Sequence, residues 1–400
     1  MLIWLNKRLP FLSFWHQHVL NYYVPKNLNV LYVFGVLGLV ALSNQFLTGL
    51  WLLMFYIPTA EQAFSSIEYI MRDVHFGWLF RYFHVVGASA FFVVLYIHIF
   101  RSLLYGSYQK PRELVWLIGV VIFCIAMAEA FFGYLLPWGQ MSYWGAQVIT
   151  SLFGVIPFLG DNLVLWLRGD YVVSGITLQR FFALHSVALP FMMIFLVILH
   201  IISLRAVGSN NPEGIDISYP KNKYDNSAEV IAFHPYFTVK DFLACMTFLW
   251  LLCLVIFFKP DLYGLTMEHA NFEPAKAWIT PADIHPMWYF APFYSMLRVI
   301  PHKLLGILIA IASIIMLFLL PWLDKSSVRS MRYKGQYSRL ALYLMVISFI
   351  LAGVMAFLPL TYYNQKITQL CIIGYFAYFL LMPFYTKVER IRPLPKKITL

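Results

Sequence analysis

Four histidines are notable because they lie inside apolar stretches, in two pairs of nearly equal spacing. His84 and His98 are 14 residues apart, and His185 and His200 are 15 apart. An α-helix turns about 100° and rises about 1.5 Å per residue, so each pair lies roughly on one helix face, about 21–23 Å apart. Ionisable residues within apolar spans are functional candidates. Imidazoles that face each other at one depth can clamp a haem from both sides. A single such histidine is more often a hydrogen-bonded core residue.

Four glycines repeat the histidine period. Gly35 and Gly49 are 14 residues apart, as are Gly119 and Gly133. Glycine allows another group to approach the helix backbone closely, as a macrocycle lying between helices requires. Ordinary packing of small residues between helices is the alternative, and it explains one such pair better than two.

Two arginines lie three residues from histidines and share their helix faces. Arg81 precedes His84, and Arg101 follows His98. Each guanidinium can pair with a haem propionate through charge-assisted hydrogen bonds. Arg101 fits equally well as one of the basic residues that set the orientation of the spans in the membrane. Two axial histidines leave the iron no open position, so such a haem stores and passes an electron.

The elements that must position these residues are membrane spans. Hydrophobic residues make up 61% of the 400-residue chain, charged residues 12%, and the mean hydropathy is +0.72. A soluble protein of this length could not bury so much apolar surface. We predict an all-α membrane protein with eight transmembrane helices in contact with lipid, and surface helices in the long loops 136–177 and 259–303. The predicted spans are 30–57, 77–105, 114–135, 178–204, 238–258, 304–323, 338–359 and 367–386.

The orientation of these spans pairs the histidines by depth. The second and fourth spans run in the same direction, so His84 matches His185 near one surface and His98 matches His200 near the other. More than two thirds of the 29 Lys and Arg residues fall on the side of the termini. The positive-inside rule therefore places both termini in the cytoplasm or the mitochondrial matrix. Topology also explains the net charge of +11, so nucleic-acid binding need not be invoked.

Other segments narrow the chemistry. The four cysteines form no CxxC or CxxCH motif, which excludes ordinary covalent c-type haem attachment and a four-cysteine iron–sulfur cluster. The first 20 residues lack the pattern of a cleavable signal peptide and are predicted to form an amphipathic segment on the membrane surface.

Several motifs resemble the cytochrome b of the cytochrome bc complex, a quinol–cytochrome c oxidoreductase. They are FGWLFRYFHVVGASAFFVVLYIHIFRSLLYGS (76–107), GYLLPWGQMSYWGAQVIT (133–150), RFFALHSVALPF (180–191), GSNNP (208–212), FHPYFTVKD (233–241) and PMWYFAPFYSMLR (286–298). The resemblance covers about residues 20–390 and implies the single-chain bacterial type. It implies a haem-binding four-helix bundle in 1–210, and four further spans in 211–400 that complete the quinol pocket.

The resemblance also implies cofactors and partners. A non-covalent haem b of lower potential would lie between His84 and His185, and one of higher potential between His98 and His200. Quinol would be oxidised near the outer haem and quinone reduced near the inner one, with proton translocation. The partners would be a Rieske iron–sulfur protein, a c-type cytochrome and a second copy of the complex. The divergent outer pocket favours a bacterial plasma membrane over the mitochondrial inner membrane.

The same resemblance implies two quinone pockets. Bulky aromatic side chains suit a quinone ring, although a Trp and Tyr belt at the membrane interface has the same composition. Lys240 and Asp241 can supply the protons that quinone reduction needs, although they also suit the charged start of a helix. The outer pocket would use Phe131, Tyr134, Gly145, Ile149, Pro286, Trp288, Tyr289 and Tyr294, and the inner pocket Arg205, Ser209, Asn210, Lys240 and Asp241.

The sequence departs from the family in several features, one of which is Val33 in place of a polar inner-pocket residue of some relatives. Met287 stands where the family usually has a glutamate that takes a proton from quinol, so we expect Glu129, His285 or Asp283 to substitute. Arg205 stands where many relatives have a histidine. The 15-residue spacing in the fourth span is one longer than in mitochondrial members, and a kink at Pro190 is expected to absorb it. Whether ubiquinone or menaquinone is the substrate stays open.

Three other classes compete with this interpretation. A non-redox transporter would use buried histidines as proton carriers and bind no haem. A haem-bearing anchor of another dehydrogenase would need fewer spans. A structural subunit gives no reason for matched histidines.

Overall fold

The computed structural model describes residues 2–8, 22–217 and 229–398. The predicted N-terminal surface segment falls mostly outside these ranges, apart from the short helix α1 (Leu2–Arg8). Almost all remaining regular structure is helical. The exception is a two-stranded antiparallel ribbon in which β1 (Tyr23–Pro25) pairs with β2 (Val230–Ala232).

Within these ranges, seven helices are long and apolar enough to cross a membrane. An eighth is a pair bent by 56°, formed by α15 (Tyr362–Leu380) and α16 (Met382–Val388). The all-α membrane fold is confirmed. The predicted last span ran straight across this bend, where Pro383 near the start of α16 lacks the N–H of a continuous helix.

The seven single spans are Val30–Leu53 (η2, Val30–Val33, and α3, Phe34–Leu53), α5 (Gly77–Tyr105), α6 (Glu113–Leu135), Gly175–Val207 (α9, Gly175–Ala183; η4, Leu184–Ala188; α10, Leu189–Val207), α11 (Tyr236–Phe258), α13 (Lys303–Leu323) and α14 (Gln336–Met355).

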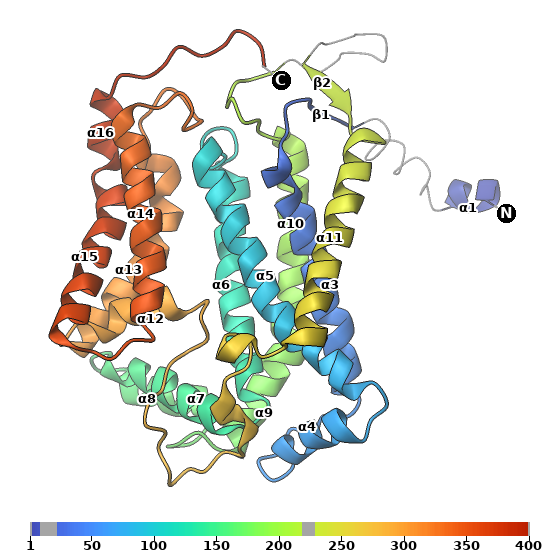
Figure 1. Cartoon of the computed structure of the whole chain (residues 1–400), viewed down its shortest axis with the longest axis vertical. Helices are drawn as coiled ribbons and strands as arrows, with labels where there is room; N and C mark the ends of the chain where they lie inside the picture. Colours follow the sequence, from blue (N-terminus) through green and yellow to red (C-terminus); the bar gives the residue numbers. More distant parts are fainter. Residues whose placement is uncertain (1, 9–21, 218–228, 399–400) are drawn as a thin grey trace.

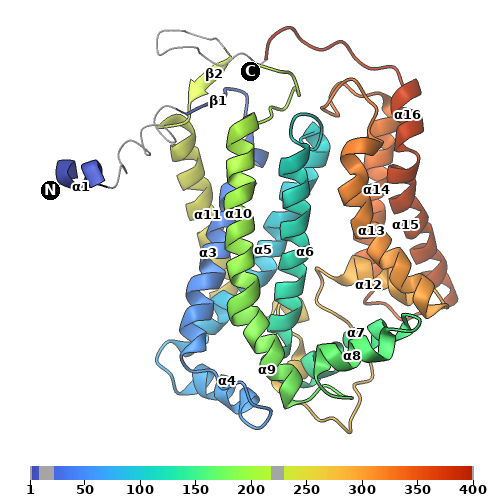
Figure 2. The ribbon, with the colours of Figure 1, turned by 180° about the vertical axis from the view of Figure 1, so that it is seen from behind.

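The spans form two groups that lie side by side (Figures 1 and 2). In the first group α3 packs on α5, α6 packs on α10, and α11 contacts both α5 and α3. In the second group α14 packs on α15 and α13 contacts α15. The C-terminus and the β ribbon lie at one end of the molecule, called the inner end below.

Short helices gather at the opposite, outer end (Figure 1). The loop 136–177 forms α7 (Gln140–Leu152) and α8 (Gly160–Arg168), and the loop 259–303 forms α12 (Ala291–Arg298), so the expectation of surface helices is confirmed. Sequence analysis did not predict the ten-residue α4 (Ala63–Arg72).

The outer faces of the spans are apolar. Along α10, Phe191, Phe195, Ile198 and Ile202 are all exposed. They recur every three or four residues, so they form one helix face directed at lipid or at another apolar partner.

A π-helical turn interrupts the fourth span at the histidine nearest the outer end. This turn, η4, contains His185 and ends two residues before Pro190, which sits in the first turn of α10. Proline has no N–H to donate to the carbonyl four residues earlier, so the α-helical ladder is already broken there. A π turn holds one extra residue. The 15 residues from His185 to His200 therefore rotate the helix by about the same angle as 14 residues of regular α-helix. The turn absorbs the offset that the sequence assigned to a kink at Pro190.

Buried charges join the loops of the inner end. Lys334 and Asp324 form an ion pair in which both side chains are fully buried. Asp324 also accepts hydrogen bonds from the Tyr108 hydroxyl and the Gln109 amide, each at 2.6 Å. Gly106 ends α5 at φ +64°, a conformation that favours glycine. This cluster fixes the end of α5 against the loop that follows α13.

Candidate haem and quinone sites

The outer histidine pair lies between α5 and η4. The ring centroids of His84 and His185 are 6.1 Å apart and the rings are perpendicular. His84 Nδ1 lies 3.0 Å from the Thr48 hydroxyl, and His185 Nδ1 lies 3.0 Å from the Glu129 carbonyl oxygen. Because these contacts occupy Nδ1, Nε2 is the nitrogen available to a metal on each ring.

The inner pair lies nearer the termini, between α5 and α10. The rings of His98 and His200 have centroids 6.4 Å apart. With metal–nitrogen bonds of about 2.0 Å and a ring radius of roughly 1.1 Å, two imidazoles on one metal ion have centroids about 6.2 Å apart. Both pairs therefore have the separation that bis-histidine ligation requires.

Each of the four glycines lies beside one histidine. A Cβ atom placed on Gly35 would lie 3.6 Å from the His98 ring, and one on Gly119 would lie 3.2 Å from the His200 ring. At the outer pair a Cβ on Gly49 would lie 3.1 Å from the His84 ring, and one on Gly133 would overlap the His185 ring. The shared 14-residue period thus places a glycine opposite every imidazole.

Gly133→Ala is expected to lose the outer haem, because the new methyl group must displace the His185 ring. Gly38→Ala is the matched control, since its Cβ would meet only Val94 at an ordinary 3.8 Å. Haem per chain, measured by pyridine haemochrome, should fall by about half for Gly133→Ala and stay unchanged for Gly38→Ala. Equal haem contents in the two variants would contradict this role for Gly133.

The two arginines retain unused donors near the histidines. Arg81 Nη1 and Arg101 Nε are buried and have no hydrogen-bond partner among the described residues. Arg101 Nη2 also lies 3.5 Å from His98 Nδ1. Buried donors of this kind are costly unless paired, and a haem propionate would satisfy them. Together the ring separations, glycine gaps and unpaired donors fit two haems.

Polar residues of α3 that sequence analysis missed hold the outer pair in place. Asn44 donates to the Phe83 carbonyl at 2.8 Å, and Gln45 donates to the His84 carbonyl at 3.0 Å. With Thr48 they form a polar patch inside an apolar span. That patch was the available signal, because buried polar groups in a membrane need partners.

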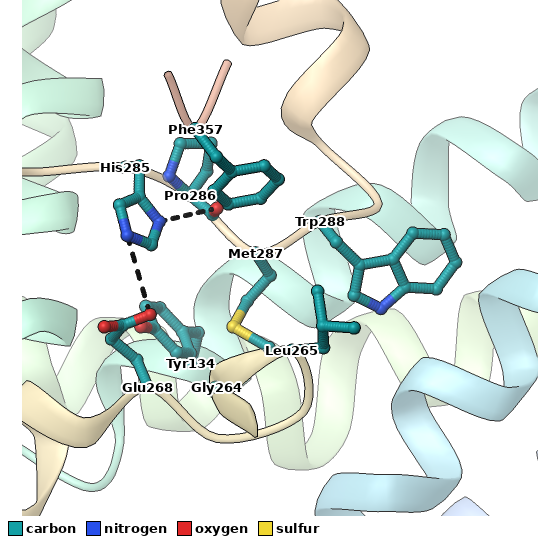
Figure 3. A pocket seen from close by; sticks show the side chains of 9 residues that line it. All are labelled: Tyr134, Gly264, Leu265, Glu268, His285, Pro286, Met287, Trp288 and Phe357. Carbon is teal, nitrogen blue, oxygen red and sulfur yellow. Dashed lines mark hydrogen bonds and ion pairs between the residues drawn. The ribbon is translucent and has the colours of Figure 1, made fainter. Parts of the chain in front are cut away.

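A small cavity near the outer end contains part of the predicted quinol pocket (Figure 3). Tyr134, His285, Pro286 and Trp288 line it, and Met287 contributes its thioether. Sequence analysis did not anticipate Glu268, Leu265 and Phe357 in the lining. Its lining, aromatic and apolar with a few polar groups, has the character of a quinone site, and the cavity encloses about 210 Å³.

The remaining outer-pocket candidates do not line this cavity. Gly145 faces the Tyr134 ring, with Ile149 one turn further along α7, and Phe131 packs against Phe181. Tyr289 stacks on Phe92 at 4.1 Å. The Tyr294 hydroxyl donates to the Ile284 carbonyl at 3.1 Å, and burial raises its pKa.

The three candidate proton acceptors are placed very differently. The Glu129 carboxylate lies 3.1 Å from His185 Nδ1, and so contacts a candidate iron ligand. Asp283 is exposed. His285 lines the cavity and pairs with Glu268 at 3.6 Å.

The inner-pocket candidates all line a large, mostly apolar opening that also reaches His98 and His200. The Arg205 guanidinium stacks on the Tyr22 ring at 3.7 Å, and Lys240 lies over the Phe237 ring at 4.9 Å. Ser209 lies 3.4 Å from the Tyr22 hydroxyl. Asp241 lies beside Lys240 on α11. Asn210 is buried, donates to the Tyr105 carbonyl at 2.8 Å, and leaves its side-chain oxygen without a hydrogen bond among the described residues.

Facing histidine pairs at two depths of a helical bundle fit a membrane-spanning protein of the bis-histidine haem class. Residues 19–208 match the family profile described as cytochrome b/b6/petB, and residues 274–376 match cytochrome b (C-terminal)/b6/petD. The chain belongs to the cytochrome b family, a family of haem proteins. It carries both parts in one polypeptide, which confirms the resemblance to the cytochrome b of the bc complex.

Relatives match over nearly the whole chain. The cytochrome b of Allochromatium vinosum is 50% identical, covering 100% of this chain and 98% of its own. The cytochrome b of Rickettsia prowazekii is 47% identical, covering 98% and 96%, and that of Rhodospirillum rubrum is 44% identical, covering 99% and 95%. A solved chain described as hyperthermophilic respiratory Complex III superposes with a TM-score of 0.91 at 36% identity, covering 97% of this chain and 99% of that one.

Proposed function

We propose that this chain is the haem-bearing subunit of a respiratory quinol–cytochrome c oxidoreductase. It oxidises quinol near its outer end, passes one electron across the membrane and reduces quinone near its inner end, so contributing to proton translocation. The observation that carries the proposal is the two facing histidine pairs, of which the inner pair lines the same opening as the candidates for the inner quinone pocket.

Each residue set has a defined task. His84 and His185 hold the haem of lower potential, and His98 and His200 hold that of higher potential. Each haem, when bound, accepts and passes one electron. Arg81 and Arg101 neutralise propionates, and the four glycines leave room for the macrocycles. The segment 1–210 supplies these residues, while 211–400 completes the outer pocket with Pro286 and Trp288.

The two pockets handle protons in opposite directions. At the outer pocket Tyr134, Trp288 and their neighbours hold the quinol ring and exclude water. At the inner pocket Lys240 and Asp241 supply protons to the reduced quinone, while Arg205 and Ser209 orient the ring or its substituents. Placing oxidation outside and reduction inside releases protons at one surface and takes them up at the other.

The proposed setting is a multi-subunit complex in a bacterial plasma membrane. A Rieske iron–sulfur protein takes the other electron of each quinol and hands it to a c-type cytochrome. The complex is proposed to be a homodimer. Bacterial relatives with the same full-length architecture support this setting.

A reduced-minus-oxidised spectrum with a redox titration tests the proposal. The purified complex is expected to contain two non-covalent b haems per copy of this chain, with separated potentials, and to reduce cytochrome c with quinol. One haem would overturn the paired-site arrangement. The absence of haem would move the protein to the transporter class.

A further inference from the structure

We propose that Glu268 and His285 together accept the proton released when quinol is oxidised in the outer pocket. This inference rests on the proposed function and assigns a residue pair to one of its steps.

The pair bridges two loop segments at the wall of the cavity (Figure 3). Glu268 Oε2 lies 3.6 Å from His285 Nε2, and both residues line the cavity with Tyr134, Met287 and Trp288. Their side chains are 21% and 19% exposed, respectively. Each therefore reaches the cavity while keeping some contact with water, as a group that takes a proton from substrate and releases it to solvent must.

Hydrogen bonds fix the segment that carries Glu268. Glu268 directly precedes the short helix η6 (His269–Phe272), and Asn271 of that helix donates to the Tyr134 hydroxyl at 2.8 Å. The Asn271 side chain also accepts from the Ser142 backbone at 2.7 Å. Two elements of the outer end, α6 and α7, thus hold the short helix that follows Glu268.

The other groups near the cavity are less suited to the step. The Met287 thioether holds no exchangeable proton, and the Tyr134 hydroxyl already accepts from Asn271. The Glu129 carboxylate contacts His185, and Asp283 is exposed. Among the residues that line the cavity, Glu268, His285 and Tyr134 are the titratable ones.

The step itself is a proton transfer. One quinol O–H bond breaks, and its proton moves to the Glu268 carboxylate, directly or through His285. The proton of the second quinol O–H bond leaves with the electron that would go to the iron–sulfur partner, and the other electron would go to the outer haem, as in the proposed function. The protonated pair then releases its proton to water at the outer end. His269 follows Glu268 and pairs with Asp261 at 3.2 Å, so it provides a further titratable group at that surface.

The test compares Glu268→Gln with Glu273→Gln in membranes that contain the intact complex. Glu273 is a matched carboxylate on the same loop, but it is exposed, pairs with Lys276 at 3.2 Å and does not line the cavity. A positioned general base contributes about 10²–10⁴-fold to a rate. We expect Glu268→Gln to lower quinol–cytochrome c reduction by about 100-fold, to alter the acid limb of the pH profile, and to keep two haems. Glu273→Gln should match the wild type.

Rescue makes the test specific to a proton acceptor. Met287 is buried and lines the same cavity, so Met287→Glu in the Glu268→Gln background should restore most of the rate. His285→Gln, which keeps a hydrogen bond but does not titrate near neutral pH, is the second variant if Glu268→Gln does not assemble with two haems. It should also lose the rate and the acid limb.

Unchanged rates and pH profiles in Glu268→Gln and His285→Gln would overturn the inference while leaving the proposed function intact. A wild-type complex with no quinol oxidation would overturn the proposed function, and this inference with it.

Discussion

Replacement of His185 by alanine is expected to leave the chain with one haem instead of two and to abolish turnover with quinol. The centroid of its ring lies 6.1 Å from that of His84. Thr48 contacts Nδ1 of His84 and the Glu129 carbonyl contacts Nδ1 of His185, and these contacts hold the two rings in place. Removing His185 leaves His84 without a second imidazole to hold the haem from its other face. The inner pair lies about four helical turns away, so its haem should remain.

A haemochrome count and a redox titration measure this effect. The variant should lose the low-potential component and keep the high-potential one. His75→Ala is the control, because His75 is exposed and precedes α5. Two haems in His185→Ala, or loss of haem in His75→Ala, would contradict the ligand assignment.

Asp324→Asn is expected to destabilise the inner end by about 3–5 kcal/mol, because it leaves the charge of Lys334 buried without a counter-charge. Both side chains of the pair are fully buried, and Tyr108 and Gln109 donate to the same carboxylate oxygen. Thermal unfolding of the detergent-purified protein, followed through haem loss and helicity, measures the change.

This prediction has a pH dependence of known sign. Burial acts against the charged carboxylate of Asp324, but the charge of Lys334 and the hydrogen bonds from Lys334, Tyr108 and Ser326 together outweigh it, so the pKa of Asp324 lies below its ordinary value. A carboxyl group whose pKa is lowered by folding stabilises the folded state fully at pH values above its pKa in the unfolded chain, about 3.9. This stabilisation is lost as the pH falls through the pKa of the folded state. The difference between wild type and Asp324→Asn should therefore be full at neutral pH and shrink in acid.

Asp216→Asn is the matched control. Asp216 also bridges inner-end loops by pairing with Arg329 at 2.7 Å, but its side chain is 80% exposed. An exposed pair of this kind contributes less than about 1 kcal/mol. Equal destabilisation by the two substitutions would show that the burial of the Asp324 pair has no special role.

The sequence predicted the parts of the molecule that follow a helical period. The 14-residue spacing of Gly119 and Gly133 predicted two gaps on one helix face with the period of the histidines, because helix geometry fixes that spacing. Their contacts with the His200 and His185 rings are seen only in the structure. Long apolar runs likewise gave the spans within a few residues.

What could not be predicted depends on contacts between distant segments. Glu268 reaches the cavity because its loop is held through Asn271 to Tyr134, 137 residues earlier in the chain. No local pattern reports such a contact. The polar residues of α3 could have been noticed, but their partners on α5 could not be identified from sequence. Glu129 was a reasonable acceptor candidate by depth, yet depth does not reveal that its side chain turns toward His185.

The π turn at His185 bears on how relatives of this protein are compared. An extra residue held within a single turn leaves the helix in phase on both sides, so the gain or loss of that residue need not rotate the second ligand away from its partner. Intervals of 14 and 15 residues between the two histidines of the fourth span are then compatible with the same arrangement of ligands. A search that demands a fixed interval between the ligands of the fourth span would divide one lineage into two, whereas an alignment that allows a single gap between residues 184 and 188 would keep it together.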